Sequence, residues 1–567
     1  MDQECKERII SDEYAALIVD INANISDIIS TDDYCTVPIN NAYLILYAPI
    51  NQLPPDLIHL YGYQTYPNCY GLVDIPSLEA SGITSLRSIP SFQLRGSGIL
   101  IGIIDTGIEY THNAFRNADG STRILSIWDQ NIQDGTPPEN FFYGTEYSNE
   151  MINQALQSED PLSIVPSTDE NGHGTMVAGT AAGSVSEENN FSGVVPDAQL
   201  VVVKLRPAKE FIKDHFAIPS EKLCYDETDI IMALLYLNIV AARMDIPISI
   251  CFSLGTFQGS HDDRDILSGY ISTMAEQIGL ATVIAGGNEG NLGHHYYGEI
   301  PAGSDYDTVE LNVGANEESF SMELWGFSPN TYSIDILSPS GEYIPRIPAR
   351  LQESREIRFI FEETVITIDY QIIEARTGDP MIFMRFLQPA QGIWRFRVYS
   401  SPPTEQAFHI WLPIQDFLTS NTAFVTPNND TTLTSPGNTT LPIVTTTYND
   451  ITDSLFLNAG RGYTRINSIS PTFAAPGVDL IVPSLNNTYS TATGSSLAAA
   501  HTTGVAAMFL EWGLLRGALL SSIEIGNILI RGARRSSDIE YPNKAWGYGI
   551  LDVYEAFESF RGDINTI

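Results

Sequence analysis

One segment constrains the fold more than any other, the run GSGILIGIIDTGI at 96–108, in which residues 99–104 are all aliphatic or glycine. A strand with one solvent-exposed face alternates apolar and polar residues. A strand that is apolar on both faces is therefore predicted to lie in the interior of a parallel sheet. The run ends in Asp105-Thr106-Gly107. This puts a carboxylate at the carboxyl edge of the sheet, where α/β folds build their sites.

The same pattern recurs along the chain. QLVVVKL at 199–205 and ATVIAGGNEG at 281–290 predict further buried strands, and DIIMALLYLNIVAARM at 229–244 has the length and periodicity of a helix. Strands that alternate with helices predict an α/β fold with a doubly wound parallel sheet.

Two parts of the chain differ from this pattern. Residues 1–75 mix strand-like runs with a short helical segment, which predicts a small α+β unit, and 306–425 holds short alternating strands separated by turn residues. Such strands predict an antiparallel sandwich or jelly roll. The α/β pattern resumes afterwards, so we expect the all-β domain to be inserted between the two parts of one α/β domain, 76–305 and 426–567.

The charge excludes two classes of partner. The chain has 29 Lys and Arg against 69 Asp and Glu, a net charge of −40. This charge repels phosphate and anionic lipid, so we expect neither a nucleic acid nor a membrane surface as partner. The sequence contains no apolar stretch long enough to span a membrane, and its start lacks the pattern of a secretory signal.

The cysteines and the clustered acidic and histidine residues predict no special chemistry. The chain has five cysteines, an odd number, and no CxxC pair. We therefore expect no zinc site, and we expect reduced structural thiols at Cys5, Cys35, Cys69, Cys224 and Cys251. His294, His295 and Glu299 do not form a helical HExxH motif of the kind that binds zinc. Asp262, Asp263 and Asp265 do not have the spacing of an EF-hand calcium loop. We therefore predict no metal site and no cofactor, and structural calcium is left open.

Three residues together suggest nucleophilic catalysis. Asp105 ends a strand, His173 stands in NGHGTMVAGTAAG, and Ser496 begins a small-residue helix in TGSSLAAAHTTGVAA. A serine hydroxyl needs a histidine to accept its proton and a carboxylate to orient that histidine. Each signal alone fits a cap or a structural role, but the three in this order and context favour a catalytic triad.

A fourth residue fits the same chemistry. Asn288 in AGGNEG offers an amide donor, and a serine at a helix N-terminus has backbone N–H groups directed at a developing oxyanion.

These motifs resemble those of the subtilases, the subtilisin-like serine proteases. The matching segments are Asp105-Thr106-Gly107, His173-Gly174-Thr175, Ala285-Gly286-Gly287-Asn288 and the serine box 494–501. The serine box departs from the family pattern only outside the triad, with Ser495 for Thr, Leu497 for Met and Ala500 for Pro. The resemblance implies a serine endopeptidase acting on protein substrates. It further implies that Ser253, Leu254 and Gly255 form the substrate-binding strand.

The resemblance also implies a function for residues 1–75 and for the inserted domain 306–425. Residues 1–75 resemble a prodomain that blocks the cleft and is cut off near 73–82, and the insert resembles the jelly roll of the clostridial Csp-type germination proteases. That group activates a cortex-lytic zymogen by limited proteolysis, which implies such a zymogen as partner and a cytoplasmic or spore-associated location. One alternative stays open, a catalytically silent regulator or scaffold that binds a partner protein.

Overall fold

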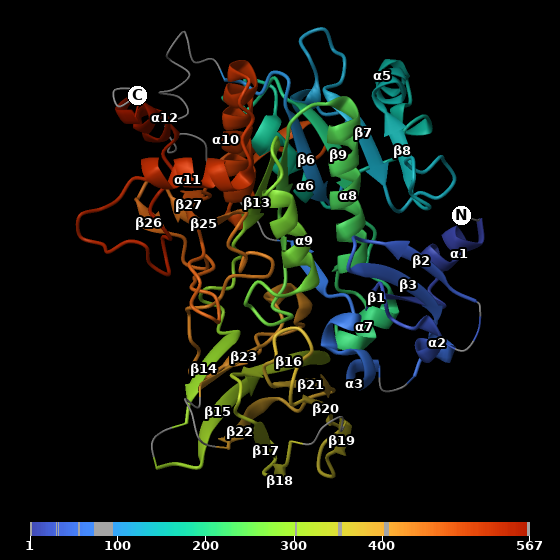
Figure 1. Cartoon of the computed structure of the whole chain (residues 1–567), viewed down its shortest axis with the longest axis vertical. Helices are drawn as coiled ribbons and strands as arrows, with labels where there is room; N and C mark the ends of the chain where they lie inside the picture. Colours follow the sequence, from blue (N-terminus) through green and yellow to red (C-terminus); the bar gives the residue numbers. More distant parts are fainter. Residues whose placement is uncertain are drawn as a thin grey trace.

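The structure is a computed structural model that describes residues 3–29, 31, 33–54, 57–72, 94–300, 303–349, 354–401 and 407–563. Within these residues, a nine-stranded sheet forms the centre of the molecule, in the order β26-β25-β13-β11-β6-β9-β7-β8 with β27 beside β25 (Figure 1). Its strands are β6 Leu100–Asp105, β7 Ile124–Asp129, β8 Thr145–Ser148, β9 Gln199–Lys204, β11 Ile248–Phe252, β13 Leu280–Ala285, β25 Ile443–Asn449, β26 Ser454–Leu455 and β27 Phe473–Pro476. The edge strands β8 and β26 pair antiparallel and the interior strands pair parallel, so the predicted α/β fold with a large parallel sheet is confirmed.

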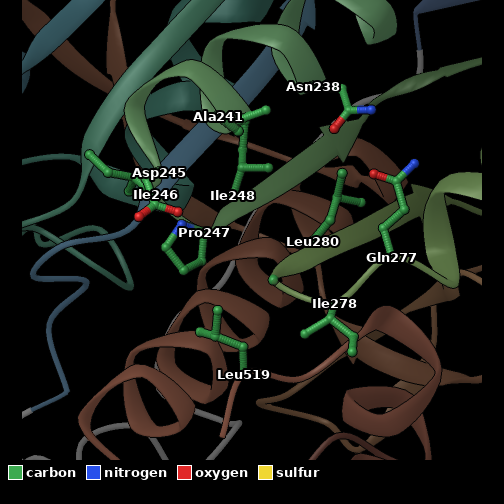
Figure 2. A pocket seen from close by; sticks show the side chains of 12 residues that line it. Asn238, Ala241, Asp245, Ile246, Pro247, Ile248, Gln277, Ile278, Leu280 and Leu519 are labelled. Carbon is green, nitrogen blue, oxygen red and sulfur yellow. The ribbon is translucent and has the colours of Figure 1, made fainter. Parts of the chain in front are cut away.

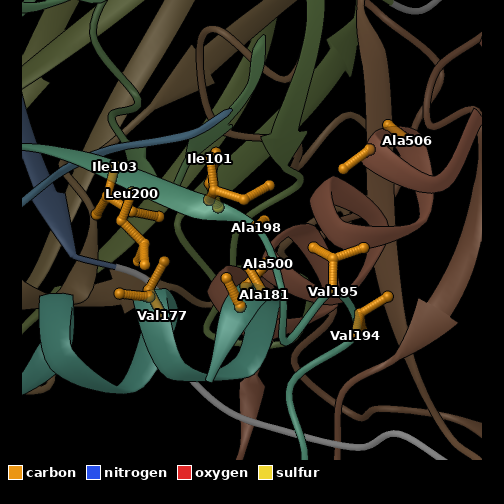
Figure 3. Packing of buried hydrophobic residues seen from close by; sticks show 14 of the residues in the cluster. Ile101, Ile103, Val177, Ala181, Val194, Val195, Ala198, Leu200, Ala500 and Ala506 are labelled. Carbon is orange, nitrogen blue, oxygen red and sulfur yellow. The ribbon is translucent and has the colours of Figure 1, made fainter. Parts of the chain in front are cut away.

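Both faces of this sheet are buried, as the aliphatic run at 99–104 predicts. Ile101 and Ile103 of β6 belong to one core cluster with helices α6 and α10, where Figure 3 shows them near Val177 and Ala181. Leu100 and Ile104, one residue out of phase, belong to the cluster on the other face, which includes residues of α8 and α9. Because side chains alternate along a strand, only a strand that is apolar at every position can serve both cores.

Eight helices surround the sheet in the described residues, and two of them, α8 and α10, are the helices predicted at 229–244 and at Ser496. The eight helices are α5 Asn149–Gln157, α6 His173–Ala182, α7 Glu210–Phe216, α8 Glu227–Met244, α9 Ile266–Ala275, α10 Ser495–Arg516, α11 Ser522–Gly532 and α12 Val553–Asp563. In the described part of the chain, none of the helices is both long and apolar enough to cross a membrane.

The N-terminal residues form a small α+β unit beside α7 and α8 (Figure 1). Its three-stranded antiparallel sheet has the order β1-β3-β2. Its elements are α1 Gln3–Ile10, β1 Tyr14–Asp20, α2 Ile25–Ile28, β2 Cys35–Pro38, β3 Tyr43–Pro49 and α3 Leu57–Tyr61, followed by β4 Cys69–Leu72.

A disulfide in this unit corrects the expectation of reduced thiols. Cys5 of α1 and Cys35 of β2 are bonded, with their Cα atoms 5.6 Å apart, whereas Cys69, Cys224 and Cys251 are free and buried. Cysteine count and spacing gave no sign of the pair, because 30 residues separate the two positions and only the packing of α1 on the sheet brings them together.

Two antiparallel sheets form a sandwich at the lower end of the molecule in Figure 1, and its strands come between β13 and β25 in the sequence. One has the order β14-β23-β16-β21-β20-β19 and the other β18-β17-β22-β15-β24, and their inner faces share one core. The strands are β14 His295–Glu299, β15 Tyr306–Val313, β16 Ser319–Gly326, β17 Tyr332–Leu337, β18 Tyr343–Ile347, β19 Ser354–Arg358, β20 Val365–Gln371, β21 Met381–Leu387, β22 Gly392–Ser400, β23 Ala407–Trp411 and β24 Ala423–Phe424. The predicted insert starts at residue 306, but strand β14, which precedes that residue, already belongs to this sandwich.

Part of the outer face of the six-stranded sheet is buried as well. Trp325, Phe383 and Trp411 project from it into a cluster that also contains Tyr63 of the N-terminal unit and Phe216 of α7. We call this group the junction cluster, because it joins the N-terminal unit, the sandwich and the α/β domain in one apolar core.

Candidate active site

Three side chains from distant parts of the sequence meet at the carboxyl edge of the central sheet. Asp105 is the last residue of β6, His173 the first of α6, and Ser496 the second of α10. The distance from His173 Nδ1 to Asp105 Oδ1 is 2.6 Å, and that from His173 Nε2 to Ser496 Oγ is 3.0 Å. All three residues are 0% exposed. A histidine thus bridges a carboxylate and a serine hydroxyl by hydrogen bonds.

Glycines at two helix starts make this geometry possible. A Cβ at Gly174 would overlap the carbonyl oxygen of Gly107, so α6 approaches the end of β6 only because residue 174 has no side chain. Gly494 precedes α10 with φ 153° and ψ −174°, a conformation open to glycine alone. Both glycines fix where the neighbouring catalytic candidates begin their helices.

The Asp105 carboxylate accepts two further hydrogen bonds. The backbone N–H of Thr106 donates to Oδ1 at 2.7 Å, and the Ser253 hydroxyl donates to Oδ2 at 2.6 Å. Sequence reasoning assigned Ser253 to a substrate-binding strand and missed this second role. The carbonyl of Ser253 also lies 3.2 Å from Ser496 Oγ, so this residue contacts two members of the group.

Asp169 is a second residue that sequence reasoning missed. It accepts hydrogen bonds from Thr106 Oγ1 at 2.7 Å, from the Gly172 backbone at 2.8 Å and from the Thr175 backbone and hydroxyl at 2.9 and 2.7 Å. These bonds tie the residue after Asp105 to the first turn of the His173 helix. An acidic residue just ahead of a predicted helix start was the available signal, because it can accept from N–H groups that the first turn leaves unpaired.

Asn288 lies next to the Ser496 helix. It follows β13, and its Oδ1 accepts a hydrogen bond from the Ser495 backbone at 3.1 Å. The Ser495 hydroxyl in turn accepts from the Gly287 backbone at 3.1 Å. The carboxamide is therefore oriented by the backbone that carries the serine.

The predicted substrate strand is occupied by another part of the chain. Leu254 and Gly255 form β12, which pairs antiparallel with β4: Leu254 opposite Leu72 and Gly255 opposite Gly71. On its other side β4 pairs with β10, Tyr225–Asp226. The end of the N-terminal unit is thus held as the middle strand of a three-stranded sheet beside the buried triad.

The other singled-out residues have structural partners. Asp262 pairs with buried Arg465 at 2.7 Å, Asp265 caps α9, and His294 lies 2.6 Å from Glu289. Burial raises the pKa of the Cys251 thiol to about 12, so this thiol stays protonated. Among the described residues, no three His, Cys, Asp or Glu side chains form a group that could hold a metal ion.

A cavity of about 200 Å³ lies at the opposite end of the strands. It is lined by the end of α8, the starts of β11 and β13, and Leu519 (Figure 2). None of the predicted site residues lines it: Asp105 is the last residue of its strand, and Ser253 and Asn288 follow the carboxyl ends of theirs.

Comparisons with known proteins agree with this geometry. The model of the subtilase family, Peptidase_S8, matches residues 96–549. An intracellular serine protease of Paenibacillus polymyxa is 25% identical over 292 residues, 51% of this chain and 70% of that protein. The major intracellular serine protease of Bacillus subtilis (strain 168) is 26% identical over 282 residues, 50% of this chain and 67% of that protein. The structure of the Clostridium perfringens CspB protease superposes with a TM-score of 0.76 at 30% identity, covering 85% of this chain and 97% of that one.

Proposed function

The chain belongs to the subtilase family and is a subtilisin-like serine endopeptidase, and from this premise we propose that Ser496, His173 and Asp105 are its catalytic triad. The observation that carries the proposal is the pair of distances from His173, 2.6 Å to Asp105 and 3.0 Å to Ser496. Such a chain of hydrogen bonds lets the imidazole take the serine proton while the carboxylate stabilises the charge that forms.

The reaction then follows from these positions. Ser496 Oγ attacks the carbonyl carbon of the scissile bond as its proton passes to His173 Nε2, and His173 returns that proton to the leaving amine. The resulting acyl-enzyme is hydrolysed when His173 takes a proton from water. Asp105 holds the imidazole with Nδ1–H directed at its carboxylate throughout.

The developing oxyanion has two donors in this scheme. The Asn288 amide and the Ser496 backbone N–H at the start of α10 stabilise it, and losing one such donor typically lowers turnover by about 10²–10³. The substrate chain adds to β12 through Ser253, Leu254 and Gly255. The pairing of β4 with β12 supports this mode, because it demonstrates that an extended segment fits there.

We further propose that residues 1–75 are a prodomain that the enzyme cuts off itself. Support comes from β4 on the substrate strand and from the full burial of the triad, which together describe a latent enzyme. The cut predicted near 73–82 lies outside the described residues. The alternative, a silent regulator, has less support, because all three catalytic side chains are present and hydrogen-bonded.

The finer proposal is limited proteolysis of a cortex-lytic zymogen in spore germination, in the cytoplasm or the spore. It is supported by similarity to the CspB protease over 85% of this chain, and by the names of the two intracellular relatives. The inserted sandwich is proposed to be the jelly roll of that group. The proposed function requires no nucleic acid, no membrane and no cofactor.

A fluorophosphonate probe tests the triad directly. We expect the processed protein to be labelled, and Ser496→Ala to lose both the labelling and the self-cleavage seen by N-terminal sequencing. Ser537→Ala, at an exposed serine, is the matched control and should keep both. Labelling that persists in Ser496→Ala would overturn the assignment.

A further inference from the structure

A buried threonine closes the space beside the proposed oxyanion site. A Cβ at Gly255 of β12 would overlap Thr434 Oγ1, and one at Gly287 would lie 2.6 Å from Thr434 Cγ2. The Thr434 side chain therefore fills the gap between two backbone segments that have no side chains of their own.

Backbone hydrogen bonds fix this threonine in place, and its hydroxyl has no partner among the described residues. Its backbone N–H donates to the Gly286 carbonyl at 3.2 Å, and the next residue, Ser435, exchanges two backbone hydrogen bonds with Thr256 at 3.1 and 2.8 Å. Thr434 is 0% exposed, and within the part of the chain that the structure describes its Oγ1 makes no hydrogen bond. A buried unpaired hydroxyl is costly, so one that persists at a functional site calls for a ligand group that pairs with it.

The position of Thr434 relates it to one substrate residue. The scissile carbonyl has to reach both Ser496 and Asn288, and the chain before it runs along β12. With the substrate placed in this way by the proposed mechanism, the side chain of the residue that supplies this carbonyl enters the space between β12 and the glycines that precede Asn288. Thr434 lies in this space, against Gly255 and Gly287.

We infer that Thr434 restricts the residue before the scissile bond to a small side chain and favours serine, whose hydroxyl pairs with Thr434 Oγ1. The inference rests on the proposed function. The threonine methyl and hydroxyl exclude large side chains by volume, and the unpaired oxygen distinguishes serine from alanine by a hydrogen bond.

The test compares four peptides that carry Ser, Ala, Leu or Phe before the same cleavage point. With the processed enzyme we expect kcat/KM to be about tenfold higher for Ser than for Ala, and at least about a hundredfold higher for Ser than for Phe. Thr434→Gly should raise kcat/KM for Leu and Phe by about tenfold or more. Thr434→Val keeps the volume, so it should still exclude Phe but lose the preference for Ser over Ala.

Two further variants make the outcome unambiguous. Thr434→Ala replaces Thr434→Gly if the glycine variant does not fold, and should relax the size limit in the same direction. Thr447→Val, at another buried threonine with an unpaired hydroxyl, should leave the preference unchanged. Equal cleavage after Phe and Ser by the unaltered enzyme, or an unchanged profile in Thr434→Gly, would overturn the inference alone. Failure of every peptide together with absent Ser496 labelling would instead overturn the proposed function.

Discussion

At the scale of single residues, the burial of Asp105 explains why its carboxylate depends on the hydrogen bonds that its neighbours donate. A buried carboxylate is stable only when hydrogen-bonded, and this one accepts bonds from Thr106, Ser253 and His173. Ser253 is the residue through which the end of β11 connects to both Asp105 and Ser496. In the proposed mechanism, the Ser253 hydroxyl therefore acts through its hydrogen bond to Asp105 and not by contact with the substrate.

Replacing Ser253 by alanine should therefore weaken catalysis more than binding. A hydrogen bond to a charged group contributes about 1.5–3 kcal/mol, so we expect kcat to fall by about tenfold to hundredfold while KM stays nearly constant. Steady-state kinetics on one peptide measures this.

Ser249→Ala is the matched control for that measurement. Ser249 lies on β11, which ends at the residue before Ser253. It is equally buried, and its hydroxyl donates to the backbone carbonyl of Thr503 at 2.8 Å. It should lose stability without a selective loss of kcat, and equal kinetic losses in the two variants would contradict the role given to Ser253.

At the scale of elements, two buried carboxylates hold the segment that contains β4. Glu227 accepts from the Asn68 backbone at 2.9 Å, and Glu323 accepts from the Tyr63 hydroxyl at 2.6 Å. Burial, reinforced for Glu227 by nearby Asp265, raises the pKa of Glu227 to about 8, and burial raises the pKa of Glu323 to about 7. Both carboxyls therefore have a higher pKa when the segment 63–72 is bound against them, the docked state, than when it is released into solvent.

The sign of the pH effect follows from these raised pKa values. The docked state binds more protons than the released state, so docking is strongest below about pH 5 and weakens as the pH rises toward about 8. In the Ser496→Ala chain, hydrogen exchange of the amides in 63–72, corrected for intrinsic rates, should therefore lose about tenfold or more in protection from pH 6 to pH 9.

Amides in β1 serve as the internal control, since in the described structure the hydrogen bonds of Glu227 and Glu323 go to other segments. Glu227→Gln and Glu323→Gln should flatten the pH dependence in 63–72, because an amide does not titrate. Protection in 63–72 that rises with pH would refute the assignment of these two carboxylates.

At the scale of the whole molecule, the junction cluster makes three units depend on one another. Tyr63 contacts Trp325, Phe216 and Phe383 edge to face, with ring centroids 6.0, 6.2 and 5.9 Å apart. These rings come from the N-terminal unit, the sandwich and α7, so the sandwich is attached through its buried outer face and not only through the two chain connections.

Truncating Tyr63 should consequently destabilise more than the N-terminal unit. Tyr63→Ala leaves a cavity at the centre of the cluster, and we expect it to lower the free energy of unfolding by about 3–5 kcal/mol. Tyr63→Phe removes only the hydrogen bond to Glu323 and should cost less. Urea denaturation followed by tryptophan fluorescence, with proteolysis of the sandwich as second probe, measures both. A sandwich that keeps its protease resistance in Tyr63→Ala would argue against shared stability.

The sequence by itself determined the parallel sheet and the residues proposed to be catalytic, because both depend on local patterns. An aliphatic run such as 99–104 has one stable environment, and Asp105, His173 and Ser496 each stand in a recognisable turn or helix start. The tertiary structure alone decided the Cys5–Cys35 bond, the contact of Ser253 with Asp105, the position of β4 on β12 and the filling of the Gly255–Gly287 gap by Thr434. Each of these joins residues far apart in sequence, and such a contact exists only after chain packing has brought its two sides together.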